Sequence, residues 1–372
     1  MADVRIEKLA DLLVNYSVVV KRGDRVMIQG DTSGEPLLKA VYAKVLQAGG
    51  HPLQMTTLSG SDELLFRYAN EDQLKHVPEP IKQAYSTYDV RIFILADPNT
   101  KALSNVDPAR MVTRAQARRD LMQIFLKRAA AGELRWVLAP YPTNAFAQDA
   151  EMGLAEYEDF LYNACMPDMN DPIGYWRKFA AGQMKVVEWL KGKDKVHIKG
   201  KDTDLRLSIA GRTFESCHGE RNMPDGEVFT GPVEDSIEGH VTFSYPAIYQ
   251  GREVTGVRLW FEKGKVVKAS AEKNEAFLLK TLDTDAGSRN VGEFAIGTNE
   301  GITKFTREIL FDEKIGGTIH MALGSGYPET GSKNESAIHW DMVCDLRDSG
   351  EIWVDDTLLH KNGKLAVKFQ NV

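Results

Sequence analysis

The chain is 372 residues long, which is more than one hydrophobic core usually supports, so two domains are expected. Apolar residues make up 43% of the sequence and charged residues 27%, as in ordinary globular proteins. The net charge of −7 argues against a nucleic-acid partner, because phosphate binding requires clustered Lys and Arg in excess.

The sequence also indicates a compartment. No apolar run approaches the roughly 20 residues of a membrane span, so no membrane partner is expected. The N-terminus, M-A-D-V-R-I-E-K, carries charge where a signal peptide has its apolar core. The cysteines Cys165, Cys217 and Cys344 form no C-x-x-C pair, and a sparse, odd set is typical of a reducing compartment. We therefore expect a cytoplasmic protein.

The first elements of the chain predict a β-α-β unit. Residues 7–16 have apolar side chains at helical spacing, and residues 25–29 and 52–57 have the composition of strands. Between these strands, a helix begins near Pro36 and ends at Gly49. The first turn of the unit reads G-x-x-x-G rather than G-x-G-x-x-G, so we expect no dinucleotide cofactor.

Strands and helices continue to alternate through the first half of the chain. Residues 90–95 and 134–139 predict two more strands, and residues 108–131 predict one long charged helix. We interpret the basic residues of that helix as a solvated face, with a binding patch for a substrate carboxylate as the alternative. These residues are Arg114, Arg118, Arg119, Lys127 and Arg128. Because residues 154–190 predict a helical bridge, we expect residues 1–188 to form an α/β domain with an open sheet.

After Lys193 the pattern changes to short alternating stretches joined by glycine-containing turns. The expected strands cover residues 196–198, 205–209, 241–244, 256–262 and 265–271, with a hairpin turn near Gly264. Residues 274–282 and 303–311 predict helices packed against the sheet. We therefore expect residues 189–372 to form a β-rich α+β domain that binds metal and carries the catalytic site.

Two histidines and an aspartate mark the candidate functional site in this second domain. His339 and Asp341 are two residues apart, and on a strand that spacing places both side chains on one face. The apolar residues that flank them would then face a core. His320 lies upstream. A single histidine on a strand is more often a hydrogen-bonded core residue than a ligand, so each histidine needs partners before it indicates a metal.

Two glutamates are candidates for those partners. Glu227 follows a Pro-Asp-Gly turn, and it could be merely a surface residue. Glu293 lies between Gly292 and Phe294, where a buried charge would be costly without a partner. Carboxylates and imidazoles together bind zinc, cobalt or manganese, and a carboxylate can bridge two ions. The sequence contains neither H-E-x-x-H nor a G-x-S-x-G elbow, so a two-ion site is favoured over a one-zinc helical site or a serine nucleophile.

Several motifs match one protein family in the same order along the chain. They are Asn222-Met223-Pro224-Asp225-Gly226-Glu227-Val228-Phe229, Gly292-Glu293, Gly297-Thr298-Asn299, Phe311-Asp312-Glu313, His320-Met321-Ala322-Leu323-Gly324, Tyr327, and Asn334-x-Ser336-x-x-His339-x-Asp341. With these motifs, the sequence resembles the thermophilic-type metalloaminopeptidases, the group of aminopeptidase T and aminopeptidase S. The resemblance extends over nearly the whole chain.

The resemblance implies an N-terminal α/β domain, a C-terminal domain with two divalent ions, and a homodimer whose parts enclose the catalytic cavity. The ions would be zinc, cobalt, manganese or magnesium. The metal ligands that the motifs imply are Glu227, Glu293, Glu313, His320, His339 and Asp341. Among them, Glu293 is the expected bridge between the ions. Tyr327 corresponds to the family's active-site tyrosine.

The expected function is hydrolysis of N-terminal residues from short peptides that have a free N-terminus. Tyr327 would donate a hydrogen bond to the oxyanion, and Glu293 or Glu313 would accept the proton of the attacking water. Tyr327 and His339 lie closer in sequence than is usual in the family. This departure keeps two alternatives open: a different metal-dependent hydrolase, or a metal- or peptide-binding protein without turnover.

Overall fold

The computed structural model describes residues 3–367, which pack as two compact units. The first unit consists of the chain up to Tyr175 together with Gly219–Pro224. The second unit consists of Trp176–His218 together with the chain from Asp225 onward. The predicted boundary after residue 188 falls inside helix α10 (Pro172–Leu190). The division into domains 1–188 and 189–372 stays a prediction.

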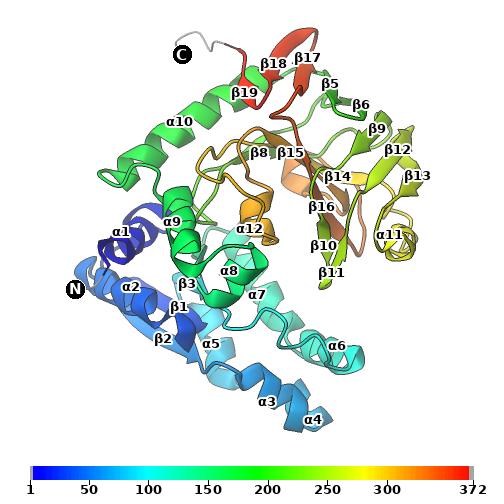
Figure 1. Ribbon diagram of the computed structural model, residues 1–372. Helices are drawn as coiled ribbons and strands as arrows, with labels where there is room; N and C mark the ends of the chain where they lie inside the picture. Colours follow the sequence, from blue (N-terminus) through cyan, green and yellow to red (C-terminus); the bar gives the residue numbers. More distant parts are fainter. Residues whose placement is uncertain (1–2, 368–372) are drawn as a thin grey trace. The chain divides into compact units, whose positions relative to one another are not determined.

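An open sheet of four parallel strands organises the first unit, in the order β2-β1-β3-β4 (Figure 1). The strands are β1 (Arg25–Asp31), β2 (His51–Thr57), β3 (Val90–Leu95) and β4 (Arg135–Pro140). Met27 on β1 and Ile92 on β3 are fully buried, whereas no residue of the edge strand β2 is buried. This arrangement confirms the predicted open α/β sheet.

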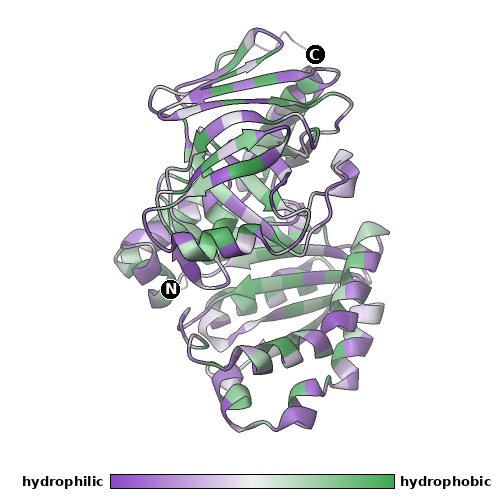
Figure 2. Cartoon of the chain, turned by 90° about the vertical axis from the view of Figure 1, so that its right-hand side faces the viewer, coloured by the Kyte–Doolittle hydropathy of each residue, from purple (hydrophilic) through white to green (hydrophobic). Residues whose placement is uncertain are grey.

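Helices connect the strands of this unit. They are α1 (Val4–Leu12), the π-helical turn η1 (Leu13–Ser17), the 3-10 turn η2 (Thr32–Gly34), α2 (Glu35–Gln47), α3 (Ser61–Tyr68), α4 (Glu71–Lys75), α5 (Glu79–Thr87), α6 (Pro108–Ala117), α7 (Arg119–Ala130), α8 (Asn144–Asp149) and α9 (Leu154–Cys165). Figure 2 shows that the helices carry both hydrophilic and hydrophobic residues. Within the described residues, no helix combines the length and the apolar character that a membrane crossing requires.

The prediction of one helix over residues 108–131 is wrong, because the chain forms α6 and α7 instead. The backbone of Arg118 has φ −90° and ψ −1°, and its N–H closes the last turn of α6. Beyond this point the two helices pack on different neighbours, α6 on α4 and α7 on α5. Periodicity alone did not reveal the break, since both helices are amphipathic and Arg118 is an ordinary helical residue type.

Two of the basic residues in α6 and α7 do not form a solvated face. The Arg114 guanidinium donates to the carbonyl of His76 at 2.8 Å, just after α4. The Arg128 guanidinium donates to the carbonyl of Tyr88 at 2.7 Å, just after α5. Carbonyls at helix C-termini lack helical partners, so these arginines satisfy them. The interpretation as a solvated face is therefore wrong for Arg114 and Arg128.

Three β-sheets dominate the second unit, as predicted for a β-rich α+β region. An eight-stranded sheet has the order β13-β12-β9-β6-β5-β17-β18-β19, a five-stranded sheet has the order β16-β15-β14-β8-β7, and β10 pairs with β11. The eight-stranded sheet consists of β5 (Lys195–Gly200), β6 (Thr203–Ser208), β9 (Glu238–Thr242), β12 (Arg258–Glu262), β13 (Lys265–Ser270), β17 (Glu351–Val354), β18 (Thr357–Lys361) and β19 (Lys364–Leu365). The other strands are β7 (Glu215–Cys217), β8 (Glu227–Thr230), β14 (Val291–Gly297), β15 (Thr318–Gly324), β16 (His339–Asp345), β10 (Ala247–Tyr249) and β11 (Arg252–Val254).

The predicted hairpin near Gly264 is confirmed, since β12 and β13 pair antiparallel around Lys263-Gly264. Besides α10, the unit contains α11 (Glu275–Leu282), α12 (Ile309–Asp312) and the 3-10 turn η3 (Pro328–Thr330). The helix predicted over residues 303–311 is wrong for most of its length. The Asp312 carboxylate accepts hydrogen bonds from the N–H and hydroxyl of Thr306 at 2.7 and 3.0 Å, and Arg307 has a φ of 63°. A left-handed residue is incompatible with a helix, so only the last turn forms.

The core of the second unit lies against one face of the five-stranded sheet. Its buried residues include Val228 on β8, Phe294 on β14, Met321 on β15 and Trp340 on β16, together with Leu259 of the eight-stranded sheet. Successive side chains of a strand point to opposite faces. The residues between these core positions therefore share the other face of the sheet.

Candidate metal centre

The candidate ligands gather on the face of the five-stranded sheet that lies opposite the core. The strand residues are Glu227 on β8, Glu293 on β14, His320 on β15, and His339 and Asp341 on β16. Ala322 of β15 pairs with Glu293 on one side and with Asp341 on the other. Because Ala322 is small, the space above it stays open for the two carboxylates. The H-x-D prediction is confirmed in its geometry: Ile338, Trp340 and Met342 are buried in the core.

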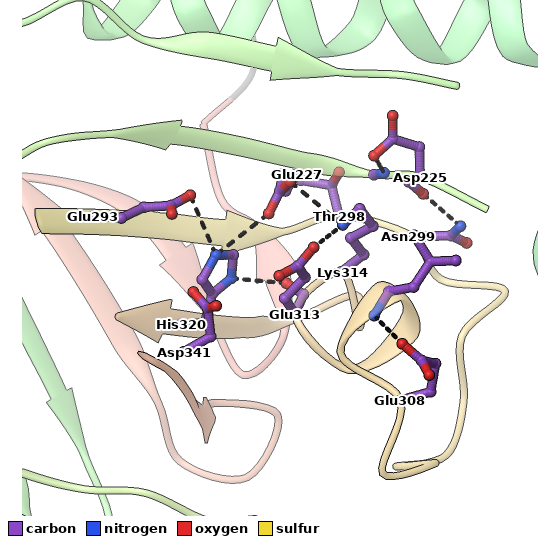
Figure 3. Close-up of polar contacts among 12 residues, drawn as sticks. Asp225, Glu227, Glu293, Thr298, Asn299, Glu308, Glu313, Lys314, His320 and Asp341 are labelled. Atoms are coloured by element: carbon purple, nitrogen blue, oxygen red, sulfur yellow. Dashed lines mark hydrogen bonds and ion pairs between the residues drawn. The ribbon is translucent and has the colours of Figure 1, made fainter. Parts of the chain in front are cut away.

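His320 is held in one orientation by the backbone. Its Nδ1 lies 2.8 Å from the carbonyl oxygen of Glu313, and since a carbonyl can only accept, Nδ1 carries the proton and donates. The other ring nitrogen, Nε2, faces Glu227 Oε2 at 3.3 Å and Glu293 Oε1 at 3.5 Å (Figure 3). A backbone carbonyl behind an imidazole is the usual support of a metal-binding histidine.

His339 repeats this arrangement on the neighbouring strand. Its Nδ1 donates to the carbonyl of Ser325 at 2.8 Å, and its Nε2 lies 3.3 Å from Glu293 Oε2 and 3.5 Å from Asp341 Oδ1. Gly292 explains why the Ser325 carbonyl can come so close. A Cβ atom at Gly292 would collide with the carbonyl oxygens of Gly324 and Ser325. The glycine before Glu293 therefore makes room for the group that orients His339.

Glu293 lies between the two imidazoles, with one oxygen directed at each. The His320 side chain is 1% exposed and the His339 side chain is 29% exposed, so the cluster runs from the interior toward solvent. Four sets of potential ligand atoms each lie within 4.8 Å of one another. Three contain only candidate ligands: Glu227, Glu293 and His320; Glu293, His339 and Asp341; and Glu313, His320 and Asp341. The fourth set joins Glu227 to Cys217 and Asp225. All six residues of the expected ligand set are thus brought together in the second unit.

Glu313 and Lys314 reach the site from the segment that follows α12. The Lys314 side chain is 0% exposed, and its ammonium forms an ion pair with Glu313 and lies 3.5 Å from Glu227 Oε1. Although burial favours the neutral amine, Glu227 and Glu313 hold the pKa of Lys314 well above its usual value. The two glutamates therefore favour the charged form of Lys314 inside the site.

Tyr327 borders the exposed side of the cluster. Its ring makes edge contacts with the rings of His339 and Phe229, both at 5.3 Å between centroids. The residue is 39% exposed, so one side of the ring remains accessible. Burial of the hydroxyl and the nearby carboxylates, led by Glu293, raise the pKa of Tyr327. The phenol is therefore a neutral hydrogen-bond donor beside the candidate ligands.

The carboxylates make this face attractive to cations. Although burial opposes the charged imidazole, Glu293 and Glu227 raise the pKa of His320 to about 10. In the same way, Asp341 and Glu293 outweigh burial and raise the pKa of His339 to about 11. Burial raises the pKa of Glu227 to about 8. Although burial also opposes the Glu293 carboxylate, hydrogen bonds from both imidazoles lower its pKa to about 2.

Divalent ions fit this donor set. Glu227 Oε2 and Asp341 Oδ1 are buried and accept no hydrogen bond from any residue that the structure describes. Each of these oxygens faces the Nε2 atom of a histidine whose Nδ1 is already committed to a carbonyl. A buried oxygen without a hydrogen bond is costly, and a divalent cation would satisfy both the oxygen and the nitrogen. Carboxylates and imidazoles are ligands of zinc, cobalt and manganese.

The sequence did not single out Lys314 or Gln183, which also shape the site. Gln183 on α10 is 3% exposed, and its Nε2 donates to the Glu227 carbonyl at 3.1 Å and to the Thr298 hydroxyl at 2.9 Å. A polar residue on the apolar stripe of α10 was the available signal for Gln183. No comparable signal marks Lys314, because a lysine beside a glutamate is normally on the surface.

The chain matches one protein family over almost its whole length. The sequence profile of the thermophilic metalloprotease (M29) family matches residues 2–357. Aminopeptidase T from Thermus thermophilus is 27% identical over 381 residues, with 91% of each chain covered. Aminopeptidase 2 from Geobacillus stearothermophilus is 26% identical over 385 residues, with 92% of each chain covered.

Solved structures with the same fold span the full length as well. Wild-type AmpT from Thermus thermophilus aligns with a TM-score of 0.86 at 24% identity, covering 98% of this chain and 99% of that one. A 2,5-dihydroxypyridine dioxygenase from Pseudomonas putida KT2440 aligns with a TM-score of 0.61 at 12% identity, covering 99% of both chains. The two-unit fold is therefore shared by proteins with different reactions in their names.

Proposed function

The chain belongs to the thermophilic metalloprotease family M29, and from this premise we propose that it is a dinuclear metal-dependent aminopeptidase. Its substrates are short peptides with a free N-terminus, in keeping with the names of the aminopeptidase relatives. The ions are zinc, cobalt, manganese or magnesium. Their proposed ligands are Glu227, Glu293, Glu313, His320, His339 and Asp341.

The observation that carries this proposal is the position of Glu293. Its Oε1 lies 3.5 Å from His320 Nε2, and its Oε2 lies 3.3 Å from His339 Nε2. Because each oxygen has its own imidazole, the carboxylate is suited to join two ions. Glu227 adds a further oxygen on the His320 side, and Asp341 adds one on the His339 side.

Two divalent ions, when bound, lower the pKa of a water molecule and polarise the scissile carbonyl. The chain's own groups complete the hydrolysis. Glu293 or Glu313 accepts a proton from the attacking water and returns it to the leaving nitrogen as the C–N bond breaks. The Tyr327 hydroxyl donates a hydrogen bond to the former carbonyl oxygen, where negative charge develops.

The compartment and the assembly are part of the same proposal. Cys165, Cys217 and Cys344 are free thiols, which supports a reducing, cytoplasmic location. A homodimer is proposed from the family resemblance.

Peptide hydrolysis by metal-reloaded protein tests the proposal. After chelation and reloading with each candidate ion, the protein should release free amino acid from unblocked peptides and leave N-acetylated peptides intact. Cleavage of blocked peptides would favour a different hydrolase. If two ions bind but varied unblocked peptides stay intact, the protein is a binding protein instead. The dioxygenase with the same fold is a reason to keep these outcomes in the test.

A further inference from the structure

Lys314 occupies an unusual place for a lysine. Its side chain is 0% exposed, and its ammonium lies 3.5 Å from Glu227 Oε1 and in an ion pair with Glu313 Oε1. Figure 3 shows the ammonium between the two carboxylates, on the side away from His320. A buried ammonium is tolerated only when it is paired with negative groups. The position therefore depends on the two glutamates.

The two carboxylate oxygens of each glutamate consequently have different surroundings. Glu227 Oε1 is directed at the ammonium, whereas Glu227 Oε2 faces His320 Nε2 at 3.3 Å and accepts no hydrogen bond from the described residues. Glu313 likewise commits Oε1 to Lys314. One oxygen of each carboxylate is thus occupied before any ion binds, and the other remains for the site.

The main chain of Lys314 is held independently of the carboxylates. The Lys314 N–H donates to the Phe311 carbonyl at 3.0 Å, and the Lys314 carbonyl accepts from the Asn299 N–H at 3.1 Å. The Glu313 carbonyl is held in turn by His320 Nδ1 at 2.8 Å. Lys314 is therefore anchored to the same framework that orients His320.

We propose that Lys314 is a positioning residue that makes Glu227 and Glu313 bind metal through one oxygen each. This inference rests on the proposed dinuclear site. A free carboxylate can hold an ion through both oxygens, which fills two coordination positions. With Oε1 held by the ammonium, each glutamate fills only one. The positions left open are available to water and to the substrate carbonyl.

Lys314 also changes the charge at the site. When they hold two divalent ions, the carboxylates of Glu227, Glu293, Glu313 and Asp341 would be ionised, and their four negative charges would equal the four positive charges of the ions. The ammonium adds one positive charge within this cluster, so the ions keep more of their electrostatic pull on a bound carbonyl. A lysine that served only as a counter-charge for folding would leave the coordination number of the ions unaltered.

Visible absorption of the cobalt-loaded protein distinguishes these two roles. The bands of Co²⁺ weaken as its coordination number rises. Lys314→Met keeps an unbranched side chain that is one atom shorter and removes the charge, which frees Oε1 of both glutamates. With two ions bound, this variant should show weaker absorption per ion than the wild type. The control is Lys265→Met, which removes one exposed lysine from β13 and should leave the spectrum unchanged.

If Lys314→Met binds both ions and its spectrum is the same as that of the wild type, the proposal is overturned. If that variant does not fold or does not hold two ions, a crystal structure of the metal-loaded wild type decides. Glu227 should then contact an ion through Oε2 alone, with Oε1 still directed at Lys314. Chelation by both oxygens overturns the proposal. Hydrolysis of unblocked peptides by the wild type tests the proposed function separately, so either idea can fail without the other.

Discussion

The two faces of the five-stranded sheet differ in composition. On one face, the apolar side chains of Phe294, Met321 and Trp340 are buried in the core. On the other face, the residues next to them in the chain place carboxylates and imidazoles close together. The same strands therefore meet two opposite physical requirements. The apolar face lowers the free energy of folding by about 25 cal/mol for each Å² of surface that it buries. The charged face opposes folding unless cations or hydrogen bonds compensate its carboxylates. Because successive side chains of a strand point to opposite faces, the residues that stabilise the fold and the residues of the candidate site lie on different faces of the same sheet.

The largest effect is expected where the charged face loses its central group. Glu293→Gln preserves the shape of the side chain but removes the charge and the ability to bridge. Bound metal and peptide hydrolysis should fall together, with hydrolysis reaching background. Metal analysis beside steady-state assays checks this result. If Glu293→Gln retains two ions and normal turnover, the charge of Glu293 is not what holds the site together.

A core substitution should show the opposite behaviour. Leu259 on β12 is 0% exposed and packs in the same core as Trp340. Leu259→Ala should lower the free energy of unfolding by about 2–5 kcal/mol through lost burial and a cavity. At a temperature where the variant stays folded, kcat and metal content should match the wild type. Denaturant unfolding and steady-state assays measure the two quantities, and a selective loss of kcat would break the separation of the two faces.

Tyr327→Phe tests whether the border of the charged face takes part in the chemistry. The substitution removes one hydroxyl and keeps the ring contacts with His339 and Phe229. If the hydroxyl stabilises the oxyanion, kcat should fall by roughly 10²–10³-fold with metal content nearly unchanged. Unchanged turnover in metal-loaded Tyr327→Phe would remove the tyrosine from the mechanism.

The two faces also differ in how well the sequence predicts them. Alternation around His339 and Asp341 predicts the strand β16 and its two faces, because polar and apolar residues mark each side. In β14 and β15 all seven residues of each strand are buried. A continuous buried strand has no solvent-facing side, so its period is not visible in the hydrophobic pattern. Glu293 and His320 were found through their chemistry and the family motifs.

Contacts distant in sequence were beyond what the pattern could reveal. The pairing of Lys314 with Glu227 joins segments far apart in the chain, and no local spacing predicts it. The helix expected over residues 303–311 failed for a local reason, since the Asp312 carboxylate accepts hydrogen bonds from the N–H and hydroxyl of Thr306. Polar side chains that bond to the backbone compete with helix formation, and their partner is fixed only when the fold forms.

A smaller effect on metal affinity is expected when the hydrogen bond from Gln183 to the backbone of Glu227 is removed. Gln183→Met leaves the Glu227 carbonyl without the hydrogen bond from Gln183 Nε2. Loss of such support typically costs 10–100-fold in metal affinity or activity, and we expect metal affinity to fall by about that amount. Ser216→Ala is the matched control, because it removes the hydrogen bonds of the Ser216 hydroxyl with Gln183 Oε1 and His218 Nδ1 but leaves both bonds that Gln183 Nε2 donates. Competition with a chromophoric chelator measures the affinity, and equal affinities in the two variants would contradict the role of Gln183.

The smallest effect concerns the segment that leads into His339, which is held by hydrogen bonds rather than by apolar packing. The Ala337 N–H and the Ser336 hydroxyl lower the pKa of Asp285 to about 2. A carboxylate with a lowered pKa adds stability that is fully present above its unfolded pKa, near 4, and is lost as the pH falls through about 2. Asp285→Asn should therefore lower the melting temperature of metal-free protein most above pH 4, and the difference from the wild type should shrink toward pH 2. Because the other titrating groups are common to both proteins, their effects cancel in this comparison. A difference that stays constant between pH 2 and 5 would mean that the charge of Asp285 does not stabilise this segment.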